Sequence, residues 1–335
     1  MFIGTLWALI AGIVLGIYAL PTKIVRGFKY ENTWGLFFFL TMFVVPTIVT
    51  FSLMKGVTEI YSDMTTGKLV VAIVSSIFWS IGVIFWGKSI DHIGISLGFS
   101  LFIATVILVG TILPIFIEGF PKINQFLMLL LGIISILVGI VFYGKAGLSK
   151  EKEQNLNRDD KNKKSMLIGI AIAIIGGLFA TGFSVANTII RPEIIDNVRK
   201  MGNPDWMTAM AVMFPIFITG GFVSVPYFIY RLSKSKAWGN FKTSNFFKNF
   251  ILVLIMASCH YGASVIFAYS AFRLGKLGNS VGYAIYNCVS VVTAVVVGLL
   301  FGEWESVSKR TMKALYGAIV FMVLGIIIIA YANAL

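Results

Sequence analysis

One histidine, His260, is the residue best suited to acid–base chemistry in this chain. It lies in the segment S-C-H-Y-G-A-S, inside an apolar run. Imidazole gains and releases a proton near neutral pH, so His260 is a candidate for proton coupling. A neutral imidazole that hydrogen-bonds to a neighbouring helix is the alternative. His92 follows Asp91 in a short polar connection, which is typical of a solvated loop histidine.

Polar and aromatic side chains inside the apolar runs could bind a small polyhydroxylated solute, because such a site combines a few hydrogen-bonding groups with rings. The candidates for solute contact are Tyr18, Trp79, Asn187, Tyr261, Tyr283, Tyr286 and Asn287. The composition is unspecific, since Asn and Tyr also join neighbouring helices. Lys23, two residues after Pro21, could lie at the mouth of a pathway or could only extend its charge towards water.

Motifs of enzymes and metal sites give no rival assignment. The pattern G-x-S-x-G occurs around Ser96 and Ser280, but both copies open apolar helices, whereas a nucleophile elbow follows a strand. There is no phosphate-binding loop and no H-E-x-x-H motif. Cys259 and Cys288 lack C-x-x-C spacing, so no metal site is indicated. We therefore expect no enzymatic activity, no metal and no cofactor, with the proton as coupling ion.

The composition of the chain is typical of an integral membrane protein. Of 335 residues, 58% are hydrophobic and 12% are charged, and the mean hydropathy is +0.91, whereas soluble domains carry about 25% charged residues. The net charge of +13 comes from short segments between apolar runs rather than from one stripe. These cations are typical of topology signals, so we expect a lipid bilayer and no nucleic acid as partner.

Ten apolar runs are each long enough to cross a roughly 30 Å hydrocarbon core as a helix. The predicted helices are 2–20, 34–54, 69–87, 94–117, 126–143, 166–190, 206–229, 250–272, 279–300 and 312–334. The odd-numbered connections carry 19 of the 27 Lys and Arg residues. The positive-inside rule then predicts that these connections are cytoplasmic and that both termini lie outside.

A hydrophilic segment divides the chain into two sets of five helices. We predict a first repeat at 1–143, a cytoplasmic linker at 144–165 and a second repeat at 166–335. Because five is an odd number, a second copy of the first repeat would enter the membrane from the opposite side, as in the inverted repeats of many secondary transporters.

Two ungapped matches support this duplication. Gly12 to Arg26 aligns with Gly177 to Arg191, and the segment I-G-I-S-L-G-F at Ile93 aligns with L-G-N-S-V-G-Y at Leu277. Each of the latter is followed, after a long helix, by an acidic turn, E-G in the first half and G-E in the second. Chance similarity between apolar helices is the alternative, because short motifs have low specificity.

The chain also resembles a known family, the L-rhamnose:proton symporters of the drug/metabolite transporter superfamily. The resemblance covers nearly the whole chain. It is carried by Y-A-L-P-T-K-I-V-R at Tyr18, E-N-T-W-G at Glu31, the basic linker, N-P-D-W at Asn203, G-G-F at Gly220, F-I-Y-R-L-S-K at Phe228 and G-L-L-F-G-E-W at Gly298.

The resemblance implies an all-α membrane protein of ten helices in two inverted repeats, with a central pathway built by the first four helices of each half. It also implies proton-coupled uptake of a monosaccharide such as L-rhamnose across a bacterial inner membrane. His260 is not assigned by the resemblance and follows from the residues alone. An exporter of the same superfamily, and a membrane-embedded enzyme or sensor, are the alternatives. The sequence leaves a homodimer open.

Overall fold

The computed structural model describes residues 2–154 and 163–335, and these residues form helices without any strand. The α-helices are α1 (Phe2–Ile17), α2 (Tyr30–Phe39), α3 (Val45–Leu53), α4 (Val57–Ser62), α5 (Thr66–Glu118), α6 (Ile123–Glu153), α7 (Lys163–Ala180), α8 (Gly182–Lys200), α9 (Thr208–Lys234), α10 (Phe246–Leu274), α11 (Gly278–Leu300) and α12 (Lys309–Ala332). Short 3-10 or π segments are η1 (Leu20–Ile24), η2 (Leu40–Val44), η3 (Asp205–Met207), η4 (Trp238–Phe241) and η5 (Gly275–Leu277).

Eight helical stretches of the described chain are long and apolar enough to cross a membrane. Two of them, 66–118 and 246–300, contain 53 and 55 residues. A straight helix of that size would be about 80 Å long, far more than the roughly 30 Å of a hydrocarbon core. The expected all-α class is confirmed, while the count of ten crossings stays a prediction.

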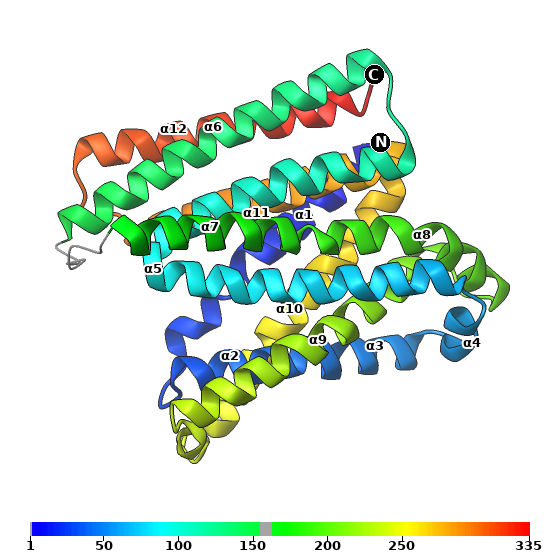
Figure 1. Ribbon diagram of the computed structural model, residues 1–335, viewed down its shortest axis with the longest axis horizontal. Coiled ribbons are helices and arrows are strands. Elements are labelled where there is room, and N and C mark those ends of the chain that lie inside the picture. Colours follow the sequence, from blue (N-terminus) through cyan, green and yellow to red (C-terminus); the bar gives the residue numbers. More distant parts are fainter. Residues whose placement is uncertain (1, 155–162) are drawn as a thin grey trace.

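The helix α5 turns back on itself at Gly94. This residue has φ 80° and ψ 171°, which is outside the helical region and open only to glycine. The ring centroids of Trp86 and Phe99 are 6.0 Å apart, although thirteen residues of straight helix would separate them by about 20 Å. Figure 1 shows the ribbon of α5 doubling back at this place.

A second turn joins α10 to α11. Gly275 has φ 80°, a conformation that L side chains rarely adopt. At Gly278 an added Cβ would overlap the backbone carbonyl oxygen of Ala271, so the start of α11 presses directly on the end of α10. These two glycines therefore allow the chain to reverse within three residues.

The long hydrophilic segment is partly helical. The helix α6 ends at Glu153 rather than at the expected residue 143, so 144–153 belongs to a helix and not to a flexible linker. Lys150 and Lys152 lie in its last turn, where positive side chains interact favourably with the negative end of the helix dipole. Residues 155–162 of the predicted linker lie outside the described part of the chain.

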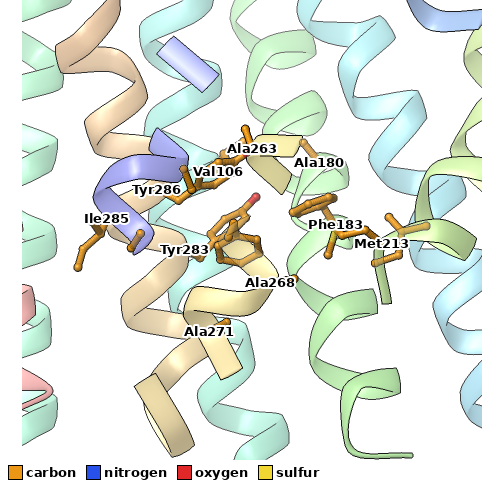
Figure 2. Packing of buried hydrophobic residues seen from close by; sticks show 14 of the residues in the cluster. Val106, Ala180, Phe183, Met213, Ala263, Ala268, Ala271, Tyr283, Ile285 and Tyr286 are labelled. Atoms are coloured by element: carbon orange, nitrogen blue, oxygen red, sulfur yellow. The ribbon is translucent and has the colours of Figure 1, made fainter. Parts of the chain in front are cut away.

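The helices pack in a pattern that pairs the two halves. The helix α1 lies against α10 and α11, while α7 and α8 lie against α5, and α6 lies along α12. Figure 1 shows α6 and α12 side by side at one edge of the molecule. Nearly every helix contributes to the buried core, and Figure 2 shows Tyr283 and Tyr286 of α11 in that core with Phe183 of α8 and Met213 of α9.

The packing of this core predicts that Gly110→Val destabilises the protein. A Cβ at Gly110 would overlap the ring of Tyr283, and the Gly110 carbonyl accepts a hydrogen bond of 2.9 Å from Ser184. Overpacking a dense core costs about 1–3 kcal/mol. We expect a clear fall in the melting temperature in detergent, whereas Gly87→Ala should melt as wild type because its Cβ would meet open space. Equal melting of the two variants would contradict the packing.

Candidate functional site

An aromatic cluster built around His260 occupies the centre of the bundle. It comprises Tyr18, Phe37, Trp79, Phe183, Phe217, His260, Tyr261, Phe267, Tyr283 and Tyr286. Its members come from α2, α5, α8, α9, α10 and α11, together with Tyr18, which directly follows α1. Helices from both halves of the chain therefore converge on one group of rings.

His260 lies at one end of this cluster. Its ring centroid is 5.2 Å from Tyr18, 5.4 Å from Phe37 and 5.6 Å from Phe217. Nδ1 lies 3.2 Å from the hydroxyl oxygen of Thr41, which also lies 3.2 Å from the carbonyl oxygen of Ala257. The imidazole thus touches three rings and one hydroxyl group.

The Thr41 contact favours one tautomer of His260. The hydroxyl has a single hydrogen, and when it donates this hydrogen to the carbonyl of Ala257 it can only accept from the imidazole. Nδ1 then carries the proton. Nε2 is left as the basic nitrogen, and it has no hydrogen-bond partner among the described residues. The site can therefore accept a proton at Nε2 without breaking the contact to Thr41.

A π-helical turn positions Thr41. Residues Leu40–Val44 form this turn between α2 and α3. Pro46 follows it and lacks the N–H group that would bond to the carbonyl four residues earlier, so the regular helix is interrupted here. Such turns within helices occur frequently at functional sites.

The other end of the cluster holds phenol groups close to polar side chains. The ring of Tyr286 stacks on Phe267 at 5.0 Å, and its hydroxyl lies 3.4 Å from the hydroxyl of Ser264. Ser264 also donates to the carbonyl of His260 at 3.1 Å, one helical turn earlier. The buried hydroxyl groups of Tyr261 and Thr50 lie close to each other. These groups can exchange hydrogen bonds with a polar ligand.

A polar network closes one end of the bundle beside this cluster. Arg191 at the middle of α8 forms an ion pair of 2.8 Å with Glu118 at the end of α5, and the two side chains are only 13% and 17% exposed. Asn279 of α11 donates to the same carboxylate oxygen at 2.9 Å and accepts from Asn187. Three helices are thus tied together by one partly buried network.

A cleft of about 440 Å³ opens next to the network and is lined by Lys68, Ile117, Glu118, Thr188, Ile189, Pro192 and Lys276. The Oδ1 atom of Asn187 and the hydroxyl of Ser280 are buried without a partner among the described residues. Unsatisfied buried polar atoms are costly unless water or a ligand reaches them. The network end is therefore suited to admit a polar molecule when it opens.

A second ion pair lies at the opposite end of α11. Lys23, in η1, contacts Glu303 at 2.6 Å, and the side chains are 40% and 44% exposed. The Lys23 ammonium also lies 4.4 Å from the ring centroid of Phe301. Lys23 thus contacts the segment that follows α11 at this end, through a pair that is more open to solvent than the Glu118 network.

Most of the residues singled out in the sequence lie in these two places. Tyr18, Trp79, Tyr261, Tyr283 and Tyr286 belong to the cluster around His260, and Asn187 belongs to the Glu118 network. Asn287 is different, because its amide donates to the carbonyl of Tyr283 in its own helix. Lys23 lies apart from the cluster, at the end of the bundle.

Sequence reasoning missed four residues of these sites: Thr41, Glu118, Arg191 and Asn279. Arg191 and the acidic turn at Glu118 were visible as markers of the repeat, although their pairing was not. A partly buried ion pair of this kind cannot be recognised until two helices that are distant in the sequence are placed side by side. In the described residues, no group of three His, Cys, Asp or Glu side chains could hold a metal ion.

The all-helical bundle, with its eight apolar stretches and a buried polar centre, is that of a polytopic membrane protein. A polar site at the centre of such a bundle is the arrangement of a secondary transporter. The chain belongs to the L-rhamnose-proton symport protein (RhaT) family, whose sequence pattern matches residues 1–334. The resemblance stated from the sequence is therefore confirmed.

Similar proteins span nearly the full chain. An L-rhamnose-proton symporter of Cronobacter sakazakii is 23% identical over 332 residues, which cover 96% of this chain and 94% of that protein. The symporter of Yersinia pestis is 21% identical over 94% of this chain and 93% of its own length. The symporter of Escherichia coli is 22% identical over 96% and 95%, respectively. These relatives are transporters by name, and none is named an enzyme.

Proposed function

We propose that this protein is a secondary carrier that takes up a monosaccharide such as L-rhamnose together with a proton across a bacterial inner membrane. The names of its relatives support the sugar and the proton. The observation that carries the proposal is the convergence of helices from both halves on His260 and its aromatic cluster. One charge moving through 100 mV supplies about 2.3 kcal/mol, enough for roughly fiftyfold accumulation.

The carrier crosses the membrane ten times in two inverted repeats, 1–143 and 166–335. The reversals at Gly94 and Gly275 support two crossings in each of the overlong stretches. The aligned glycines Gly12 and Gly177 support the repeat, because each brings its helix against the later part of a helical hairpin: Gly12 against Val289 and Gly177 against Thr105. The Lys and Arg distribution supports cytoplasmic odd-numbered connections and outside termini.

Two buried asparagines give independent support for the repeat. Asn32 donates to the carbonyl of Ala237 at 2.9 Å, and Asn197 donates to the carbonyl of Ile60 at 3.0 Å. Their numbers differ by the same 165 residues as Gly12 and Gly177. Each anchors a connection that follows a helix of the other half. This correspondence supports the proposal that the two halves are copies of one repeat.

The solute binds beside the aromatic cluster, with its faces against the rings and its hydroxyls on Tyr261, Tyr286, Ser264 and His260. Nε2 of His260 takes the coupled proton. Because Tyr18 contacts the imidazole, a solute that displaces its ring changes the surroundings of His260 and thereby links the two binding events. Trp79 and Tyr283 shape the site, and Asn187 joins it to the Glu118 network.

Access alternates between two ends that are closed by ion pairs. With cytoplasmic odd-numbered connections, the Glu118 network lies at the outer end and the pair of Lys23 and Glu303 lies at the inner end. The outer pair is the more buried of the two, which supports a state closed to the outside. Both pairs are formed in this structure, and rocking of the two repeats would open one of them while the other stays closed.

Counterflow of labelled sugars in proteoliposomes tests the proposed function. Vesicles preloaded with L-rhamnose should concentrate labelled L-rhamnose. In vesicles without internal sugar, added L-rhamnose should carry protons inward, seen as a pH rise outside. An exporter of other metabolites should ignore L-rhamnose and its stereoisomers. An enzyme or sensor should show no counterflow of any sugar. Absence of counterflow across a panel of monosaccharides would overturn the proposal. The oligomeric state, including a homodimer, can be measured on the same preparation.

Removing the charge of Glu303 is expected to shift the carrier towards the inward-open state. Glu303→Gln leaves Lys23 without its counter-ion, and because both groups are more than a third exposed the effect should be modest. We expect a cysteine placed at Ile24, the last residue of η1, to react two- to fivefold faster with an impermeant reagent applied to the inner side. Glu305→Gln, in the same turn, is the matched control, and equal rates in both variants would contradict an inner gate.

A further inference from the structure

A second cleft lies between α6 and α12, away from the solute site. Its volume is about 810 Å³, and it lies where α6 ends and α12 begins. The lining residues are Phe142, Lys145, Leu148, Ser149, Lys152, Glu153, Arg310, Thr311, Lys313 and Ala314. No residue of the aromatic cluster or of the two ion pairs lines it, so it is separate from the transport pathway.

The cleft carries a surplus of positive charge. Lys145, Lys152, Arg310 and Lys313 are exposed, and none of the four has an ion pair with a described residue. Four positive charges at the ends of two neighbouring helices repel one another, and an anion bound between them would offset this repulsion. The arrangement therefore favours an anionic ligand.

Among the described residues that line the cleft, Glu153 is the single carboxylate, and it is already engaged. Glu153 accepts hydrogen bonds from the backbone N–H of Ser308 at 2.6 Å, from the Ser308 hydroxyl at 2.7 Å and from the Thr311 hydroxyl at 2.7 Å. It caps the start of α12 and ties that helix to the end of α6. Glu153 therefore holds the two helices in place and leaves the four cations to the ligand.

An apolar surface continues from the cleft along the same two helices. Phe142 stacks on Phe321 of α12 at 5.6 Å with nearly parallel rings. Val141 and Val320 are each 55% exposed on these helices. In a membrane this surface meets acyl chains, while the cations lie at the level of the headgroups. A ligand with a negatively charged headgroup and apolar chains would therefore contact both the cations of the cleft and the apolar surface beside it.

We propose that the cleft between α6 and α12 binds the headgroup of an anionic phospholipid, with the phosphate held by Lys145, Lys152, Arg310 and Lys313. Basic pockets between membrane helices are a known way to hold such headgroups. The guanidinium of Arg310 can bind a phosphate through two parallel hydrogen bonds, whereas each lysine contributes a single positive charge. The inference does not depend on which solute is carried.

Native mass spectrometry of the purified full-length protein tests this site. The protein in detergent is titrated with phosphatidylglycerol, and the bound lipids are counted. For the variant Arg310→Gln with Lys313→Gln we expect about a tenfold or greater increase in the apparent dissociation constant of one lipid, because two of the four charges are lost. Phosphatidylcholine, which has no net charge, should bind wild type and variant equally.

Control variants keep the outcome decisive. Lys242→Gln with Lys248→Gln removes two exposed charges outside the cleft, one between α9 and α10 and one in the first turn of α10, and should retain wild-type affinity. Arg310→Lys with Lys313→Arg keeps the charge and should bind within about threefold of wild type, which guards against misfolding of the Gln variant. Equal affinity of the cleft and control variants would overturn the proposal. Displacement of the lipid by millimolar inorganic phosphate would show a site for soluble anions instead.

Discussion

Breaking the Glu118 network is expected to lower solute uptake by about tenfold or more. Glu118→Ala leaves Arg191 partly buried without a counter-ion and removes the acceptor of Asn279. Removal of one partner of a buried pair is strongly unfavourable, so the closed outer end loses its advantage over the open one. A shift of 1–3 kcal/mol between two states changes their ratio about 5- to 150-fold. Uptake should fall because the carrier no longer closes behind the solute.

Accessibility separates this effect from misfolding. In a Cys259→Ser, Cys288→Ser background, Ile189→Cys places one thiol in the cleft beside the network. Glu118→Ala should speed its labelling by an impermeant maleimide from outside by about tenfold, while Glu118→Gln, which keeps an acceptor for Arg191 and Asn279, should show a smaller increase. The exchanged pair, Glu118→Arg with Arg191→Glu, should recover part of the uptake. Unchanged labelling in Glu118→Ala would refute an outer gate.

Proton coupling should disappear when His260 becomes Gln. The amide can keep a hydrogen bond to Thr41 but cannot take up a proton at neutral pH. We expect solute-induced alkalinisation outside the vesicles to fall at least about tenfold, while counterflow of the solute, which needs no net proton movement, stays within about threefold of wild type. Accumulation driven by a pH gradient should be lost with it.

Two nearby changes distinguish a proton carrier from a structural histidine. Thr41→Val removes the partner of Nδ1 and keeps the imidazole, so coupling should persist with a displaced pH dependence. Tyr18→Phe keeps the ring contact with His260 and should keep coupling as well. If His260→Gln retains the full proton signal, the imidazole only joins two helices. Loss of folding can be recognised from the melting temperature of the same samples.

Much of the fold could be predicted because hydropathy is a local property. Each apolar run must lie in lipid or in the core, and its backbone must be helical when no water is present to bond it. The boundaries were less certain. The helix α6 runs ten residues beyond the predicted end, since polar residues such as Lys150 and Lys152 can continue a helix once it leaves the membrane.

The candidate site could be predicted only in part. His260 was recognisable because an ionisable group in an apolar run is unusual whatever its neighbours are. The aromatic candidates were selected by type, and the structure joins them to His260 directly or through a chain of ring contacts that runs over Phe217, Phe183 and Phe267. Asn287 was selected by the same argument; its amide donates to the carbonyl of Tyr283 in its own helix, and its contact with the solute stays a prediction.

The sequence by itself determined a helical membrane protein of this family with a histidine inside an apolar run. Composition, the apolar runs and the order of the motifs can all be read without knowing which segments meet in space. The tertiary structure alone decided which charges meet. Glu118 and Arg191 are 73 residues apart, and Lys23 and Glu303 are 280 apart. Their pairing depends on how the helices are placed in space. The same holds for the contact between His260 and Thr41 and for the cationic cleft between α6 and α12.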